Sequence, residues 1–263
     1  MAFVTVCSHR IEYERIDVAR ADRPVLVFLH EGLGSVAMWR DFPRELAHAT
    51  NCNAIVYSRY GYGNSDPIAE LRSVRYMHDE ALLSLPELLD RLAVERPILV
   101  GHSDGASIAI IYAGASKRDV AGVVLMAPHV LVEDISIQSI AAAKIAYEKT
   151  DLRGKLARYH ADVDSAFRGW NDIWLHPDFR RWNIEEYLPG IARPVLVIQG
   201  EDDEYGTMDQ VRRIERQVPD VDLLELADCR HSPHRDQPAA VIEAVTRFVD
   251  RIASTPAVEK RRP

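Results

Sequence analysis

The chain of 263 residues has few cysteines and no cysteine spacing typical of a bound metal. Cys7, Cys52 and Cys229 are far apart in the sequence, and no Cys-x-x-Cys pair occurs. A disulfide framework or a zinc knuckle needs cysteines in pairs, usually at short spacing. We therefore expect reduced thiols, and the sequence predicts neither a structural metal nor a disulfide scaffold.

The sequence also lacks an excess of basic charge and any long apolar run. It has 32 Lys and Arg against 40 Asp and Glu, a net charge of −8, whereas a nucleic-acid surface needs clustered basic residues. The first ten residues contain no basic segment followed by an apolar stretch, and no run approaches the length of a membrane span. These features predict a cytoplasmic protein that binds neither nucleic acid nor membrane, and they leave its oligomeric state open.

Short apolar, β-branched runs alternate with helical patterns along most of the chain. This alternation predicts an α/β fold, with a mostly parallel central sheet and helices on both faces. We expect an opening hairpin from residues 3–8 and 11–18. The further strands are expected at 25–29, 54–57, 98–100, 122–126, 195–198 and 221–226, and the helices at 37–49, 77–92, 106–115, 208–217 and 238–252.

The alternation stops after residue 126. From 129 to 190 no convincing strand appears, but helical runs such as 135–149 do, and three of the chain's four tryptophans lie here. A structureless loop of that length is implausible inside a compact domain, so we expect a helical cap inserted between two strands. The predicted organisation is a core of residues 1–128 and 191–253, a cap of residues 129–190 and a flexible tail of residues 254–263.

The pentapeptide Gly101-His102-Ser103-Asp104-Gly105 joins the expected strand 98–100 to the expected helix 106–115. A serine in such a sharp strand-to-helix turn has a strained backbone, and the crowded turn favours glycine two residues on either side. The pattern Gly-x-Ser-x-Gly in this position is typical of a nucleophile elbow. Ser103 is therefore the candidate nucleophile.

A serine nucleophile needs a histidine to take its proton and a carboxylate to orient that histidine. The strand at 195–198 leads into the acidic stretch 201–204, and the strand at 221–226 leads into His231 and His234. Ligands of parallel sheets bind beyond the carboxyl ends of the strands, which is where both segments fall. The residues by themselves leave Asp202 and His234 open as alternatives to Asp203 and His231.

Four short motifs carry a family resemblance: Leu-His-Glu-Gly-Leu-Gly-Ser at 29–35, Ser-Arg-Tyr-Gly-Tyr-Gly-Asn-Ser at 58–65, the elbow, and His-Ser-Pro-His at 231–234. Through them the chain resembles the capped, esterase-like members of the α/β-hydrolase superfamily over about residues 25–252. The resemblance implies the α/β-hydrolase fold and the chain order serine, acid, histidine. In that family the acid usually lies three residues after the glycine that ends its strand, which implies Asp203. The histidine lies two residues before a proline, which implies His231.

The resemblance also implies where the oxyanion is bound. A tetrahedral intermediate needs backbone N–H donors, and the residue after the nucleophile, Asp104, supplies one. The second donor comes from the loop after the first core strand, where the family commonly has His-Gly-x. This chain has Glu31 in place of that glycine and Gly32 next. We expect the Gly32 amide to be the second donor.

Four residues are candidates for substrate contact. Glu31 places a carboxylate near the reacting carbonyl and would disfavour acidic substrates, unless it is salt-bridged or turned away towards neighbouring backbone or Arg59. His102, inside the elbow, is a pocket or packing residue. Trp170 and Trp174 are four apart, so they either share the buried face of a cap helix or line an apolar pocket.

The predicted function is a serine hydrolase that cleaves a carboxylic ester, or a related thioester or lactone, through an acyl-enzyme. The expected substrate is a small to medium apolar molecule, and no cofactor is implied. C–C bond hydrolysis and cofactor-free haloperoxidase chemistry use the same triad in the superfamily and are the alternatives.

Two rival readings come from other classes of protein. Residues 32–37 satisfy Gly-x-Gly-x-x-Ala, the dinucleotide fingerprint, with Arg59 as a candidate partner for the NADP phosphate. That reading gives the elbow and the later acid and histidine no role. A metal site from His231, His234 and 201–204 has suitable ligand types, but His-x-x-His on a loop is weak evidence without further spacing.

Overall fold

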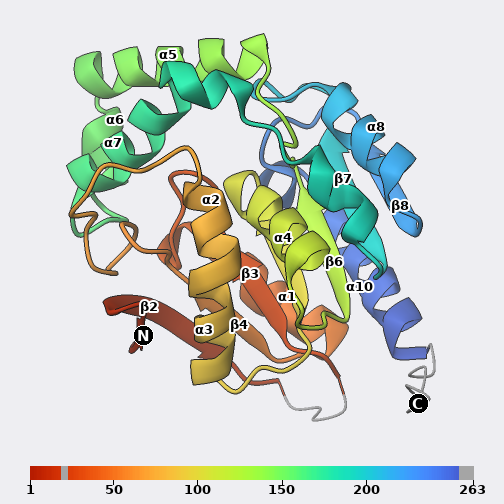
Figure 1. The fold of residues 1–263 in the computed structure, drawn as a ribbon. Coiled ribbons are helices and arrows are strands. Elements are labelled where there is room, and N and C mark those ends of the chain that lie inside the picture. Colours follow the sequence, from red (N-terminus) through yellow and green to blue (C-terminus); the bar gives the residue numbers. More distant parts are fainter. Residues whose placement is uncertain (19–22, 255–263) are drawn as a thin grey trace.

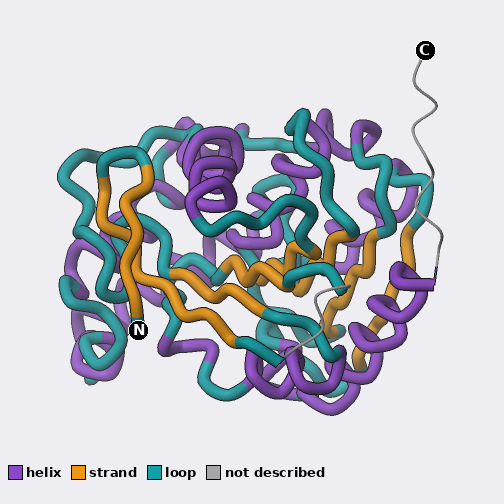
Figure 2. Tube along the Cα trace, turned by 90° about the horizontal axis from the view of Figure 1, so that it is seen from below, coloured by secondary structure: helices purple, strands orange, loops and turns teal. Residues whose placement is uncertain are grey.

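The computed structural model describes residues 1–18 and 23–254, which form a single eight-stranded sheet with helices on both sides (Figures 1 and 2). The strand order across the sheet is β1-β2-β4-β3-β5-β6-β7-β8. The strands are β1 (Ala2–Val6), β2 (His9–Ile16), β3 (Leu26–Leu29), β4 (Ala54–Tyr57), β5 (Ile98–His102), β6 (Gly122–Met126), β7 (Val195–Gly200) and β8 (Val221–Leu226).

The sheet is mixed, and its parallel part carries the predicted site. The hairpin β1–β2 is antiparallel, as the sequence predicts, and β2 pairs antiparallel with β4. All other neighbours pair in parallel, so the carboxyl ends of β3 to β8 lie at the same edge. Strands β3 to β7 are buried throughout, because helices cover both faces, whereas the edge strand β8 is partly exposed.

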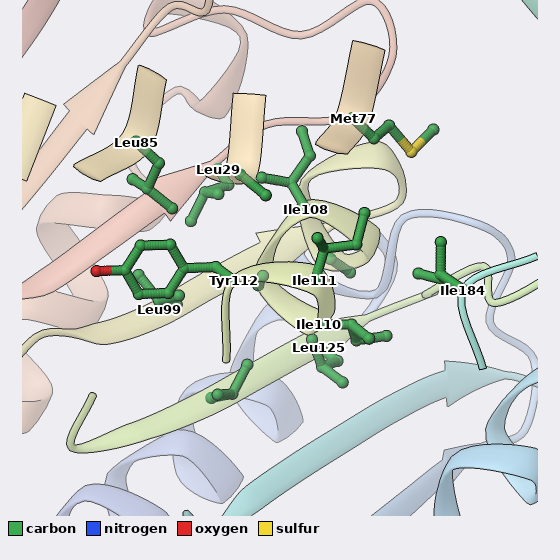
Figure 3. Packing of buried hydrophobic residues seen from close by; sticks show 14 of the residues in the cluster. Leu29, Met77, Leu85, Leu99, Ile108, Ile110, Ile111, Tyr112, Leu125 and Ile184 are labelled. Atoms are coloured by element: carbon green, nitrogen blue, oxygen red, sulfur yellow. The ribbon is translucent and has the colours of Figure 1, made fainter. Parts of the chain in front are cut away.

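Alternate residues of each strand enter two hydrophobic cores, one on each face of the sheet. On β3, Val27 and Leu29 join one core and Leu26 and Phe28 the other. Figure 3 shows the first core, in which side chains of α4 lie between the sheet and neighbouring helices. The second core packs α1 and α10 against the sheet. The α-helices are α1 (Phe42–Thr50), α2 (Tyr76–Asp79), α3 (Leu85–Arg91), α4 (Asp104–Ala115), α5 (Asp134–Lys149), α6 (Leu152–Leu156), α7 (Val163–Trp174), α8 (Met208–Gln217), α9 (Pro233–Asp236) and α10 (Pro238–Ser254).

Two predicted helices differ from the structure. The helix expected at 37–49 is wrong as one unit: a 3₁₀ turn, η1 (Ala37–Trp39), is separated from α1 by Arg40, whose φ of 54° cannot continue a right-handed helix. The helix expected at 77–92 is present but contains a π-helical segment, η2 (Glu80–Ser84), between α2 and α3. Pro86 lies just beyond that segment, and a proline can neither donate its helical hydrogen bond nor fit against the preceding turn.

The helical insertion lies between β6 and β7, where the sequence predicts it. It contains α5, α6 and α7 and the 3₁₀ segments η3 (Pro177–Arg181) and η4 (Glu185–Gly190). In Figure 1, α5, α6 and α7 gather at one end of the molecule, and we call residues 134–190 the cap. The exact boundaries of core and cap stay predictions. The expected tail lies outside the described residues except for Ser254, and no helix of 1–18 or 23–254 is long and apolar enough to cross a membrane.

Candidate active site

Ser103 occupies the turn between β5 and α4 with the strained backbone that the motif predicts. Its φ and ψ are 53° and −118°, outside the regions that side chains favour. A Cβ on Gly105 would enter the backbone of Leu29, and one on Gly101 would meet the backbone at Gly105 and Ala106. Only glycine therefore lets the start of α4 pack this closely on the sheet. The turn leaves Ser103 just past the carboxyl end of β5.

The structure brings Ser103, His231 and Asp203 together from the ends of three strands. The Ser103 Oγ lies 2.9 Å from His231 Nε2, and His231 Nδ1 lies 2.9 Å from both carboxylate oxygens of Asp203. A proton on Nδ1 can be donated only to Asp203, which leaves the Nε2 lone pair facing the serine hydroxyl. This is the tautomer that a general base needs.

Asp203 is held as a carboxylate. Burial by itself would raise its pKa, but the attraction of His231, its hydrogen bond and the Tyr205 amide outweigh that effect and set the pKa at about 2. The side chain of Gln199 donates to Oδ2 at 2.8 Å, and the Tyr205 amide donates to Oδ1 at 2.7 Å. Asp203 is thus charged and fixed in position at neutral pH.

The sequence alternatives lie elsewhere. Asp202 is exposed, and its amide donates to the Cys229 carbonyl at 3.0 Å. The ring of His234 is buried against Trp39 and Phe42, with centroid distances of 4.9 and 5.3 Å. The described residues contain no group of three His, Cys, Asp or Glu side chains arranged to hold a metal ion.

The peptide between Glu31 and Gly32, in the loop after β3, is held in place through its carbonyl. The Glu31 carbonyl accepts from His30 Nδ1 at 2.6 Å, from Arg59 Nη2 at 2.9 Å and from the Gly34 amide at 3.0 Å. In a trans peptide the N–H points away from the C=O. Burial and the neighbouring Arg59 hold the pKa of His30 well below its usual range, so its ring is a neutral, fixed donor to this carbonyl.

The Glu31 carboxylate does not bind Arg59, which instead contacts the Glu31 carbonyl. Its Oε2 lies 3.5 Å from His102 Nδ1, and its Oε1 lies 3.6 Å from Arg235 Nη2. Burial raises its pKa, but His102 and Arg235 more than offset this, and the pKa stays well below the usual range. His102 Nε2 in turn lies 2.7 Å from the His231 carbonyl, which can only accept, so Nε2 donates. Glu31 and His102 therefore form a chain of contacts that ends at the backbone of His231.

A buried network around Asp104 was not predicted from the sequence. Tyr76 donates to Asp104 Oδ2 at 2.7 Å, Trp174 Nε1 donates to Oδ1 at 3.2 Å, and Arg59 Nη2 lies 3.7 Å away. The side chains of Arg59 and Asp104 are each 1% exposed, so the two charges compensate each other away from water. The network fixes the side chain of the first residue of α4, directly after Ser103. Its members come from separate segments without a shared motif, so no sequence signal joined them.

The cap touches the loop after β3 directly. A Cβ on Gly32 would enter the indole of Trp170, so that ring packs on the glycine itself. His160 bridges two core loops: its Nδ1 accepts from the Gly63 amide at 3.0 Å, and its Nε2 donates to the Leu33 carbonyl at 2.9 Å. Trp170 and Trp174 both lie on the buried face of α7 and line the cavity at Ser103, so the two interpretations of their spacing hold together.

This cavity, which we call the Ser103 cavity, has a volume of about 190 Å³. Its apolar wall includes Ile140, Trp170 and Trp174 of the cap. Its acidic wall includes Glu31 and Glu204, and none of its described lining residues is a lysine or arginine. His129 also lines it. The pKa of its imidazole is lowered, mainly by burial and to a smaller extent by the nearby His231. The cavity therefore combines an apolar wall from the cap with acidic side chains from the loops after β3 and β7.

The dinucleotide reading does not fit these contacts. The Gly34 amide closes a tight turn on the Glu31 carbonyl, and α1 begins only at Phe42, so no long helix starts at the glycines. Arg59 is 1% exposed and faces Asp104, which removes it as a partner for a nucleotide phosphate. Instead, Gly32 leaves room for the indole of Trp170, and Gly34 leaves room for the side chain of Glu31.

Comparisons with known proteins agree with the fold. The chain is 26% identical to the 2-hydroxy-6-oxononadienedioate/2-hydroxy-6-oxononatrienedioate hydrolase 2 of Pseudomonas putida, over 78% of this chain and 80% of that protein. It is 34% identical to the proline iminopeptidase of Lactobacillus helveticus strain DPC 4571, but that match spans 38% of this chain and only about a third, 34%, of the peptidase.

Among solved structures, a carboxylesterase of the thaumarchaeon Nitrososphaera gargenis superposes with a TM-score of 0.77 at 17% identity, covering 95% of this chain and 98% of the esterase. At this identity the likeness concerns the fold. The family model described as "Alpha/beta hydrolase family" matches residues 26–244, most of the chain. The chain therefore belongs to the alpha/beta hydrolase family.

Proposed function

We propose that the protein is a serine hydrolase that cleaves carboxylic esters, or related thioesters and lactones, of small neutral acids through an acyl-enzyme. The observation that carries the proposal is the continuous chain of contacts from Ser103 through His231 to Asp203, with both spacings at 2.9 Å. The nucleophile, the base and the orienting acid thus stand in hydrogen-bond contact before any substrate arrives. The likeness to a carboxylesterase supports the fold that this chemistry uses.

The first half of the reaction forms an ester with the enzyme. His231 Nε2 takes the Ser103 proton as Oγ attacks the substrate carbonyl, and Asp203 stabilises the imidazolium that forms. The carbonyl oxygen gains negative charge and lies against the amides of Asp104 and Gly32. Each such donor is worth about 3 kcal/mol in the transition state. His231 then gives the proton to the leaving oxygen or sulfur, and the C–O or C–S bond breaks.

The second half releases the acid. A water molecule on the leaving-group side gives its proton to His231 Nε2 and attacks the acyl carbon. The tetrahedral intermediate uses the same two amides. As it collapses, His231 returns the proton to Ser103 Oγ, so the enzyme recovers its starting state without any cofactor.

The charges around the Ser103 cavity favour a neutral acyl group. Glu31 and Glu204 line it, as does Asp104, whose charge Arg59 compensates, and no lysine or arginine is among its described lining residues. A carboxylate on the substrate would meet these groups in a region of low dielectric, which costs binding energy. The relative from Pseudomonas putida is named for a dioate substrate, and a doubly charged acid of that kind does not suit these walls.

The experiment combines labelling with a panel of substrates. A fluorophosphonate should label the protein at Ser103, as located by peptide mass spectrometry, and Ser103→Ala should remove the label. Ser232→Ala is the matched control, because Ser232 also lines the cavity but should leave labelling intact. Absence of label at Ser103 in the folded protein would contradict the proposal.

The substrate panel separates the alternatives. We expect p-nitrophenyl esters of neutral acids to be cleaved faster than esters that carry a free carboxylate on the acyl chain. Faster cleavage of a vinylogous diketone acid than of any ester would favour C–C hydrolysis. Faster cleavage of proline β-naphthylamide than of any ester would favour a peptidase. Halide oxidation by peroxide without ester cleavage would favour the haloperoxidase alternative.

A further inference from the structure

A second cavity lies where the cap meets the loop after β3, and its wall is basic. It has a volume of about 320 Å³ and is lined by Arg40, Lys155, Arg158 and Arg235, together with Tyr159. No lining residue that the structure describes carries a carboxylate. In a chain with 40 acidic and 32 basic residues, this grouping runs against the average charge. We call this cavity the basic hollow.

Two of its four cations have acidic partners and two do not. Lys155 Nζ lies 3.0 Å from Asp151, and Arg235 Nη2 lies 3.6 Å from Glu31. Arg40 and Arg158 form no ion pair with any residue in 1–18 or 23–254. The hollow therefore keeps a net positive charge. Guanidinium groups present several N–H donors in one plane, which matches the oxygens of a phosphate.

The backbone at Arg40 is unusual for a residue with a long side chain. Its φ of 54° and ψ of −131° lie close to those of Ser103, in a region where glycine is the relaxed choice. Strained positions of this kind gather at functional sites. Here the strain places a cation at the rim of the hollow between η1 and α1.

The basic hollow adjoins the Ser103 cavity through one ion pair. Arg235 lines the hollow, Glu31 lines the Ser103 cavity, and the two side chains lie 3.6 Å apart. The Arg235 guanidinium also donates to the Met38 carbonyl at 3.0 Å, which fixes it on the core side. A molecule whose carbonyl reaches Ser103 thus lies next to a cationic hollow on the core–cap boundary.

We propose that the basic hollow binds a phosphate carried by the leaving group of the substrate, so that the enzyme acts on esters or thioesters with a neutral acyl part and a phosphorylated far end. This inference rests on the proposed hydrolase function, which supplies the reaction at Ser103. The acidic wall of the Ser103 cavity accepts the neutral acyl part, and Arg40 and Arg158 attract the phosphate.

The test compares two thioesters that differ only in the phosphate: S-butyryl pantetheine and S-butyryl 4′-phosphopantetheine. At low ionic strength we expect kcat/KM to be about tenfold or more higher for the phosphorylated thioester, mainly through KM, because charge-assisted hydrogen bonds are strong. Added salt should reduce that ratio. Arg40→Gln and Arg158→Gln should each lower it, and the double variant should bring it close to one.

Arg216→Gln is the matched control, because Arg216 is an exposed arginine on α8 that pairs with Asp209 at 3.6 Å and lines neither cavity. It should keep the wild-type ratio. A ratio of one in the wild type, or a ratio that the double variant keeps, overturns the inference. If neither thioester nor any simple ester is cleaved, the proposed function fails. Calorimetric titration with inorganic pyrophosphate then tests separately whether the basic hollow binds an anion. Binding that the double variant loses supports an anion site, and no binding overturns it.

Discussion

The Ser103 cavity and the basic hollow lie on two sides of the Glu31–Arg235 pair, yet they are built in different ways. In the first, the side chains of Ser103, Asp203 and His231 lie just past the ends of strands and are held by hydrogen bonds such as those around Asp203. In the second, the four cations are exposed side chains on α6, on α9 and in the turns just after η1 and α6, and two of them, Arg40 and Arg158, have no described ionic partner. The Ser103 cavity is thus defined by fixed geometry, and the basic hollow by its net positive charge.

The difference follows from what each region has to do. Proton transfer requires atoms within about 3 Å and correctly aligned, so the groups at Ser103 must be rigid before the substrate binds. Attraction of an anion requires net charge and donors, and flexible arginines satisfy both without a fixed position. Substitutions should therefore act steeply in the first region and gradually in the second.

The largest effect is expected from Ser103→Ala. Loss of the nucleophile should lower kcat for a neutral ester by about 10⁴-fold or more, because the remaining groups provide only binding and oxyanion contacts. Thermal unfolding should change little, since alanine fits the same turn. Calorimetric binding of pyrophosphate should persist in this variant. If that binding disappears as well, the two cavities are not separate sites.

Asp203→Asn should come next, with a loss in kcat of about 10³- to 10⁴-fold at neutral pH, because the amide no longer stabilises the imidazolium. The pKa of about 2 also predicts a stability effect. A carboxyl whose pKa is lowered by folding contributes stability above its unfolded pKa, near 3.9, and loses it as the pH falls towards 2. Urea unfolding at several pH values between 4 and 2 should show this acid-dependent loss in the wild type and a smaller loss in the variant.

The same pKa bears on the activity profile. Because Asp203 stays ionised above about pH 4, its own titration should not add a second step to the acid limb of kcat/KM for a neutral ester. A second ionisation between pH 4 and 6 would contradict the assignment of Asp203 as the orienting acid. The measurement should use a substrate for which chemistry limits the rate.

Substitutions that break the contacts between Glu31, His102 and the His231 carbonyl should have an intermediate effect on kcat. Glu31→Gln and His102→Phe should each lower kcat by about tenfold, because each removes a polar contact that helps to hold the His231 backbone. If Glu31 acts through His102, the double variant should be no worse than the single variants. Fully additive losses would show that Glu31 acts on the substrate directly.

The smallest effect is expected on stability, from Trp174→Phe. The phenyl ring keeps most of the packing in the cap but cannot donate to Asp104, whose Oδ1 lies 3.2 Å from the indole Nε1. We expect a loss of about 2 kcal/mol and a melting temperature lower by about 5 °C. The ratio for the two thioesters should stay at its wild-type value, since Trp174 is not part of the hollow. A melting temperature equal to the wild type would contradict the anchoring role of this bond.

Much of the core was predictable because its signals are local. The runs at 54–57, 122–126 and 208–217 match β4, β6 and α8 at both ends, since each is bounded by residues that end an element. The break in helix 37–49 was not, because no property of Arg40 in the sequence signals a positive φ. Similarly, the π segment depends on how the chain accommodates Pro86 inside a helix.

For the site, the elbow, Asp203 and His231 could be named because each follows a strand in a recognisable motif. The surroundings could not. Asp104 meets Tyr76, Arg59 and Trp174 only after four segments have folded together. The basic hollow likewise combines side chains 195 positions apart, from Arg40 to Arg235, which no pattern in the sequence links.

The missing side chain at Gly32 limits how this enzyme can be redesigned. The indole of Trp170 occupies the space that any larger residue would need. Variation in the cap and variation in the loop beside Ser103 are therefore not independent: a library that enlarges position 32 must shrink position 170 in the same clone, or the cap will be displaced. Homologues that carry a bulkier residue at the first position should show a smaller one at the second.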